Sequence, residues 1–95
     1  MLKFAMRPTL LLAALTILLP FSARAADPAF CAGYTDAALN QVRAALSSPN
    51  CRAGAVGARW STDRHVHFDW CRTQPPAAAA AERQVRTDFL RGCRG

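Results

Sequence analysis

The stretch WSTDRHVHFDWCRT, from Trp60 to Thr73, decides the fold, because it predicts a short helix that carries one of the four cysteines of the chain. Ser61 is a favoured N-cap residue, and Asp63 places a negative charge in the first turn, where it stabilises a helix. Trp60 is expected just outside the cap, and the helix is expected to end near Thr73. This segment therefore predicts a middle helix with another helix on each side of it.

The helix before it is predicted from about Gly33 to Leu46. Apolar residues recur there at spacings of three and four, which gives one buried stripe along a helix. The stripe consists of Tyr34, Ala38, Val42 and Ala45 or Leu46. Thr35 or Asp36 favours the start of this helix. The run Ser47-Ser48-Pro49-Asn50 ends it, and a loop with Gly54 and Gly57 follows.

The helix after it is predicted from the Pro75-Pro76 turn through an alanine-rich run that strongly favours helix formation. Val85 and Phe89 are expected on its apolar face, together with Ala78, Ala81 or Glu82, and Cys93. Glu82 and Arg86 form a favourable pair at i,i+4. Gly92 and Gly95 are expected to end the helix. The fold class is therefore all-α, a small three-helix domain.

Residues 1–25 have the pattern of a cleaved signal peptide, and residues 26–95 form the single domain. Basic residues precede the apolar run from Thr9 to Leu19, and Ala23-Arg24-Ala25 presents small residues where a signal peptidase cleaves. That run is too short to span a membrane, so we expect a periplasmic or secreted protein with no stable membrane insertion after cleavage. Cleavage lowers the formal charge from +6 to +3, which gives no indication of nucleic-acid binding.

The mature chain of 70 residues has few large apolar side chains, so covalent crosslinks are expected. Its four cysteines allow three pairings. With helices running up, down and up, Cys31 and Cys71 lie at one end, and Cys51 and Cys93 lie at the other. A helix of about 15 residues is about 22 Å long, whereas a disulfide needs Cα atoms within about 7 Å. We therefore predict the disulfides Cys31–Cys71 and Cys51–Cys93.

The segment RHVHFDWCR, residues 64–72, contains residue types that bind metals or carry redox chemistry. On a helix, however, His65 and His67 point to different faces, whereas a zinc site needs three or four converging ligands. The cysteine spacings lack the C-x-x-C of redox motifs, and no hydrolase or phosphate-loop motif is present. We therefore predict a non-enzymatic protein with no metal and no cofactor.

The leading function hypothesis is a small interaction module that binds an unknown protein or cell-envelope component. Arginine and tryptophan dominate the binding energy of protein interfaces. The candidate binding surface consists of Arg59, Trp60, His67, Arg83 and Arg86. Trp60 and Trp70 are both expected in the core, with exposure of either as the alternative. A periplasmic chaperone-like or stress protein with exposed apolar surface is the second hypothesis, and a small enzyme that uses His67 is the third.

The cysteines and aromatic residues together form a distinctive pattern. It consists of Cys31-x-x-Tyr34, Cys51, Arg59-Trp60, His67-x-x-Trp70-Cys71 and Arg86-x-x-x-Leu90-x-x-Cys93. This pattern resembles that of uncharacterised small exported proteins of proteobacteria. The resemblance implies an exported helical domain and assigns no catalytic residue. It also implies that His67, beside the Trp70-Cys71 pair, is the structurally significant histidine and that His65 is incidental.

Overall fold

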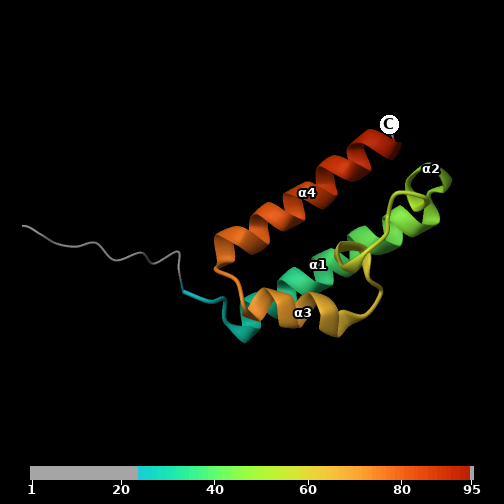
Figure 1. Cartoon of the computed structure of the whole chain (residues 1–95). Coiled ribbons are helices and arrows are strands. Elements are labelled where there is room, and N and C mark those ends of the chain that lie inside the picture. The colour runs from blue at the N-terminus through green and yellow to red at the C-terminus, as the bar shows by residue number, and fades with distance from the viewer. Residues whose placement is uncertain (1–23, 95) are drawn as a thin grey trace, which may run out of the picture.

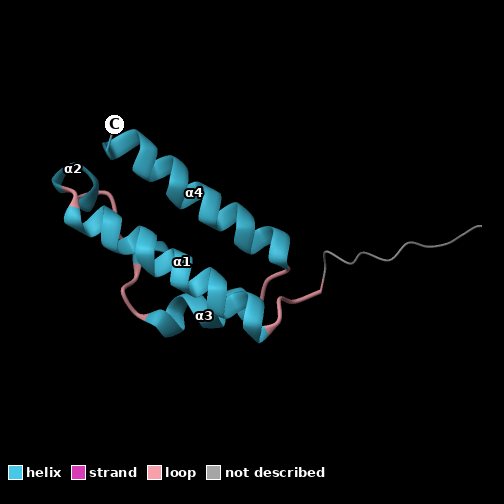
Figure 2. Cartoon of the chain, turned by 180° about the vertical axis from the view of Figure 1, so that it is seen from behind, coloured by secondary structure: helices cyan, strands magenta, loops and turns pink. Residues whose placement is uncertain are grey.

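The computed structural model describes residues 24–94, and every regular element in this part of the chain is a helix. Its elements are α1 (Pro28–Ser47), α2 (Pro49–Arg52), the 3₁₀ helix η3 (Ala58–Trp60), α3 (Arg64–Arg72) and α4 (Pro76–Arg94). The long helices α1 and α4 lie side by side, and α3 packs on the N-terminal half of α1 (Figures 1 and 2). The all-α prediction is confirmed, with the short α2 and η3 added between the first and middle helices. Most of the predicted signal peptide lies outside the described residues.

Local capping explains where α1 and α3 begin. The Asp27 side chain accepts a hydrogen bond of 2.8 Å from the Phe30 backbone N–H, and Pro28 occupies the first turn. Helix α1 therefore starts about five residues earlier than predicted and includes Cys31. Asp63, rather than Ser61, caps α3 by accepting from the His65 N–H at 2.9 Å. Ser61 instead accepts from the Asp63 N–H and shapes the turn before the cap.

The apolar stripe of α1 is confirmed, whereas the predicted apolar face of α4 is confirmed only in part, because Phe89 and Cys93 pack against the core but Val85 does not. Tyr34, Ala38, Val42 and Ala45 are buried, together with Cys31 and Thr35. On α4 the buried residues are Ala79, Arg86 and Leu90, while Val85 is exposed. The prediction followed apolar periodicity alone and could not place an arginine on the buried face. Gly92 does not end the helix, which continues to Arg94.

The structure pairs Cys31 with Cys71 and Cys51 with Cys93, at Cα–Cα distances of 5.7 and 5.1 Å. The first bond joins the start of α1 to the end of α3. The second joins α2 to the end of α4. Each bond lies in its own apolar cluster, the first with Ala26, Tyr34, Ala38 and Ala79, the second with Val42, Ala45, Ala55, Trp60 and Leu90. The disulfides therefore hold the two ends of the domain, as the up-down-up order predicts.

No helix among residues 24–94 combines the length and the apolar character that a membrane span requires.

We expect each disulfide to contribute a large share of the stability of this small domain. Each closes a loop of about 40 residues, which corresponds to roughly 4 kcal/mol in the chain-entropy model. The double variants Cys31→Ser/Cys71→Ser and Cys51→Ser/Cys93→Ser should each show a free energy of unfolding lower by about that amount, measured by guanidinium denaturation. A loss below about 1 kcal/mol in either variant would contradict this role of the crosslink.

Candidate functional site

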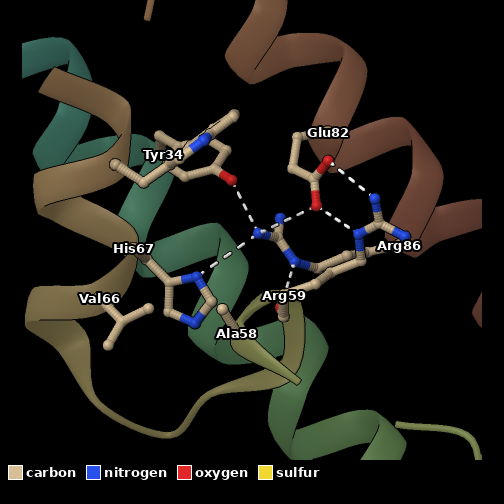
Figure 3. A pocket seen from close by; sticks show the side chains of 8 residues that line it. Tyr34, Ala58, Arg59, Val66, His67, Glu82 and Arg86 are labelled. Atoms are coloured by element: carbon tan, nitrogen blue, oxygen red, sulfur yellow. Dashed lines mark hydrogen bonds and ion pairs between the residues drawn. The ribbon is translucent and has the colours of Figure 1, made fainter. Parts of the chain in front are cut away.

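A half-open pocket lies where α3, η3 and α4 meet over α1 (Figure 3). Its volume is about 300 Å³. The lining combines buried polar groups with half-exposed apolar ones. The lining residues are Tyr34, Ala58, Arg59, Val66, His67, Trp70, Glu82 and Arg86. This pocket is the candidate functional site, because it gathers most of the charged and aromatic side chains that the sequence singled out.

The floor of the pocket is the guanidinium of Arg86, a residue only 1% exposed. Its Nε donates to the backbone oxygen of Arg59 at 3.0 Å, and its Nη2 donates to the Tyr34 hydroxyl at 2.7 Å. Its Nη1 lies 3.4 Å from Oε1 of Gln41. A buried charge is tolerated only when its hydrogen bonds are satisfied, and these partners come from α1 and η3. Arg86 therefore fixes the surrounding backbone as well as the pocket floor.

His67 connects this arginine to the turn before α3. Its Nε2 lies 2.7 Å from the backbone oxygen of Ser61, which can only accept, so Nε2 carries the proton. The tautomer follows from this hydrogen bond, and Nδ1 then accepts from Nη2 of Arg86 at 3.4 Å. The side chain is 2% exposed. Both ring nitrogens are thus engaged within the fold.

Glu82 is shared by two arginines at the pocket edge. Its carboxylate accepts from Nε and, at 3.2 Å, from Nη2 of Arg59, and it lies 4.0 Å from Nη2 of Arg86. The hydrogen bond that Arg59 donates to Glu82 raises the pKa of Arg59 further above its already high value. The Arg59 side chain is 46% exposed although its guanidinium is held in two-point contact. The result is an exposed arginine in a fixed orientation.

Trp70 and Val66 form the apolar rim of the pocket, and each is 36% exposed. The Trp70 ring lies against Tyr34, with ring centroids 5.8 Å apart. The expectation that Trp70 is a core residue is therefore wrong. Helix α3 has nine residues, and its buried positions are taken by His67 and Cys71. Trp70 consequently lies at the edge of the buried face, where one side of its ring meets solvent.

The structure brings together three of the five residues of the predicted binding surface, namely Arg59, His67 and Arg86. Two of these, His67 and Arg86, are buried and support the pocket from below. Trp60 is not a surface residue, because it packs in the core against Phe89 with ring centroids 4.8 Å apart. Arg83 is exposed and lines a neighbouring groove between α1 and α4.

The predicted binding surface lacks five of the pocket residues, namely Tyr34, Ala58, Val66, Trp70 and Glu82, although exposure of Trp70 is the alternative considered for that residue. Tyr34 was assigned only to the apolar stripe of the first helix, although its hydroxyl is a polar group that needs a partner when buried. Glu82 is predicted to pair with Arg86 on one helix and is one alternative for the apolar face of that helix. Arg59, which completes the cluster, lies in η3, so its contact with Glu82 depends on tertiary structure.

Within residues 24–94, no three side chains of histidine, cysteine, aspartate or glutamate come together as metal ligands would. Comparisons of the chain with protein-family models, curated proteins and solved structures find no match. The function is therefore inferred from the geometry of the site.

We predict that Tyr34 ionises above the ordinary value of 10.0, because burial raises its pKa more than the hydrogen bond from Arg86 lowers it. It is the one tyrosine of the chain, so the ultraviolet absorbance of phenolate reports it directly. Since the folded pKa is raised, the corresponding stability is present below about pH 10 and is lost as the pH rises through the folded value. The denatured protein is the control. An equal midpoint in both states would contradict the burial of this hydroxyl.

Proposed function

We propose that this chain is a small exported, non-enzymatic module that binds another protein through the pocket. The binding surface consists of Arg59, Val66 and Trp70, and we call it the pocket face. Tyr34, His67, Glu82 and Arg86 hold it in place from beneath.

The observation that carries this proposal is the rigid exposed arginine beside a half-exposed tryptophan. Arg59 is held by Glu82 through two hydrogen bonds, and the Trp70 ring is held against Tyr34. A side chain that is already fixed loses less entropy on binding, so a preorganised surface gains affinity. Arginine and tryptophan are also the residue types that most often dominate an interface.

The engagement of the polar groups supports a binding role over an enzymatic one. Catalysis by His67 would need a ring nitrogen free to exchange a proton with a substrate, and both nitrogens are used within the fold. The four cysteines all form disulfides, so none is present as a thiolate nucleophile. The same groups that resemble catalytic residues in the sequence therefore act as supports for the pocket face.

Two further observations support export to the periplasm or beyond. Stable disulfides are typical of oxidising compartments. The folded core also begins at the predicted cleavage point, because Ala26 is buried whereas Arg24 and Ala25 are exposed. The Ala26 N–H donates to the backbone oxygen of Gln74 at 2.8 Å, and the Arg72 side chain donates to the Ala26 carbonyl. The resemblance to small exported proteobacterial proteins is part of the same proposal.

The chaperone-like hypothesis has less support. The large exposed apolar residues of the described region are Phe30, Val56, Val66, Trp70 and Val85. They are spread over the helices α1, α3 and α4 and over the loop that follows α2. Of these residues, Val66 and Trp70 both line the pocket. A chaperone that holds unfolded proteins uses one large exposed apolar patch. The scattered apolar residues of this domain therefore favour a specific protein contact over chaperone activity.

Photocrosslinking tests the pocket face directly. A benzophenone side chain placed at Val66, on the pocket rim, should give a discrete protein adduct in the envelope of cells that export the chain. The same group at Val85, which is similarly exposed on α4, is the matched control and should not give this adduct. Adding Trp70→Ala to the Val66 probe should remove the adduct while the circular dichroism spectrum is kept. Equal adducts at both positions, or none at Val66, would contradict the proposal.

A further inference from the structure

We propose that the pocket face binds an acidic segment of its partner, in which a carboxylate lies next to an apolar side chain. The carboxylate pairs with Arg59, and the apolar side chain packs between Val66 and Trp70. This inference rests on the proposed function and names the chemistry of the partner that the pocket selects.

The charges of the pocket favour an anionic group. Arg59 and Arg86 contribute two positive charges, and Glu82 contributes one negative charge. The pocket therefore carries one net positive charge. Arg86 is buried and its donors face Tyr34, His67, Gln41 and the Arg59 carbonyl. The excess positive charge is accordingly presented by the exposed Arg59.

The donor geometry of Arg59 fits one carboxylate. A guanidinium has two forks, one formed by Nε and one Nη, and one formed by the two Nη atoms. Nε and Nη2 bind Glu82, so the first fork is occupied. Nη1 and the second N–H of Nη2 donate to no other described residue, and they form the fork that receives a carboxylate at two points. Glu82 therefore orients Arg59 and leaves its outer fork available.

The apolar half of the pocket accounts for the neighbouring apolar side chain. Val66, Trp70 and Ala58 line it, and its volume of about 300 Å³ is at the lower end for small-ligand sites. One aliphatic or aromatic side chain would cover the exposed side of the Trp70 ring and remove it from water. An acidic residue beside an apolar residue satisfies both halves of the pocket at once.

Two other ligand classes fit less well. A cation would have to displace Arg59 from Glu82 and approach the guanidinium of Arg86. A phosphate group carries more charge than a carboxylate and binds best where several donors converge. The pocket offers it only the outer fork of Arg59, and the negatively charged Glu82 carboxylate lies beside that fork. The pocket face therefore selects a protein segment over a phosphorylated envelope component.

Blocked dipeptides test this chemistry on the unmodified oxidised protein. Acetyl-Leu-Glu-amide is titrated while the indole N–H signal of Trp70 and the Nε–H signal of Arg59 are followed by nuclear magnetic resonance. We expect both to shift with a Kd of about 1 mM, as suits a fragment of an interface. Acetyl-Leu-Gln-amide lacks the charge, and acetyl-Gly-Glu-amide lacks the apolar side chain. Each should bind about three- to tenfold more weakly.

A variant pair assigns the contact to Arg59. Arg59→Gln should weaken the binding of acetyl-Leu-Glu-amide about three- to tenfold and abolish its preference over the glutamine dipeptide. Arg91→Gln is the matched control, because Arg91 is also exposed and paired with a carboxylate, that of Asp88 at 3.0 Å. It lies outside the pocket and should leave the affinity unchanged. The buried Trp60 indole is an internal control in every titration.

Equal affinities for the glutamate and glutamine dipeptides would overturn the proposal, as would an absence of shifts at Arg59 and Trp70. Stronger binding of inorganic phosphate than of the glutamate dipeptide at the same site would also overturn it, in favour of a phosphorylated envelope component. If the dipeptides do not bind but the Val66 crosslink persists and depends on Trp70, the proposed function as an interaction module is supported. Only the proposal of an acidic partner segment is then wrong. If the Val66 crosslink is absent as well, both proposals fall.

Discussion

The guanidinium of Arg86 joins α4 to every other element around the pocket. It donates to Tyr34 on α1, to His67 on α3 and to the backbone of Arg59 in η3. Since a buried charge without partners is costly, these groups must stay in place for the domain to fold around it. The position of the exposed side chains follows from this contact. Arg59 is held through its carbonyl by Arg86 and through its guanidinium by Glu82, and the Trp70 ring lies on the tyrosine that accepts from Arg86.

Two kinds of interaction stabilise this small domain. One is the pair of disulfides, and the other is the polar cluster formed by Tyr34, His67, Glu82 and Arg86. One crosslink holds each end, and each is surrounded by an apolar cluster. Between them the chain has few large apolar side chains, and the middle of the domain is occupied by hydrogen-bonded polar groups. A polar cluster of this kind favours one packing of the helices, because its hydrogen bonds are all formed in one arrangement. The pocket face thus gains rigidity from the same contacts that complete the interior.

The sequence predicted those features that depend on local pattern and on the length of helices. The stripe of α1, the helical character of every long segment and the end of α3 near Thr73 follow from periodicity and capping. The cysteine pairing follows from which ends the helices bring together. The candidate site was harder, because burial of Arg86 and exposure of Trp70 both reverse the ordinary preference of the residue type. Their positions depend on groups from three distant segments, and a pattern within one helix contains no information about them.

The most direct test of this account is the stability of Arg86→Lys with both disulfides intact. Lysine keeps the charge but cannot serve Tyr34, His67 and the Arg59 carbonyl together, because its ammonium lacks the planar fork of the guanidinium. In guanidinium denaturation, we expect the free energy of unfolding to fall by at least about 2 kcal/mol, and the Arg59 Nε–H signal to lose its fixed position. Arg91→Lys, at an exposed site, is the control and should change stability by less than about 0.5 kcal/mol. Equal stabilities of the two variants would contradict the central role of Arg86.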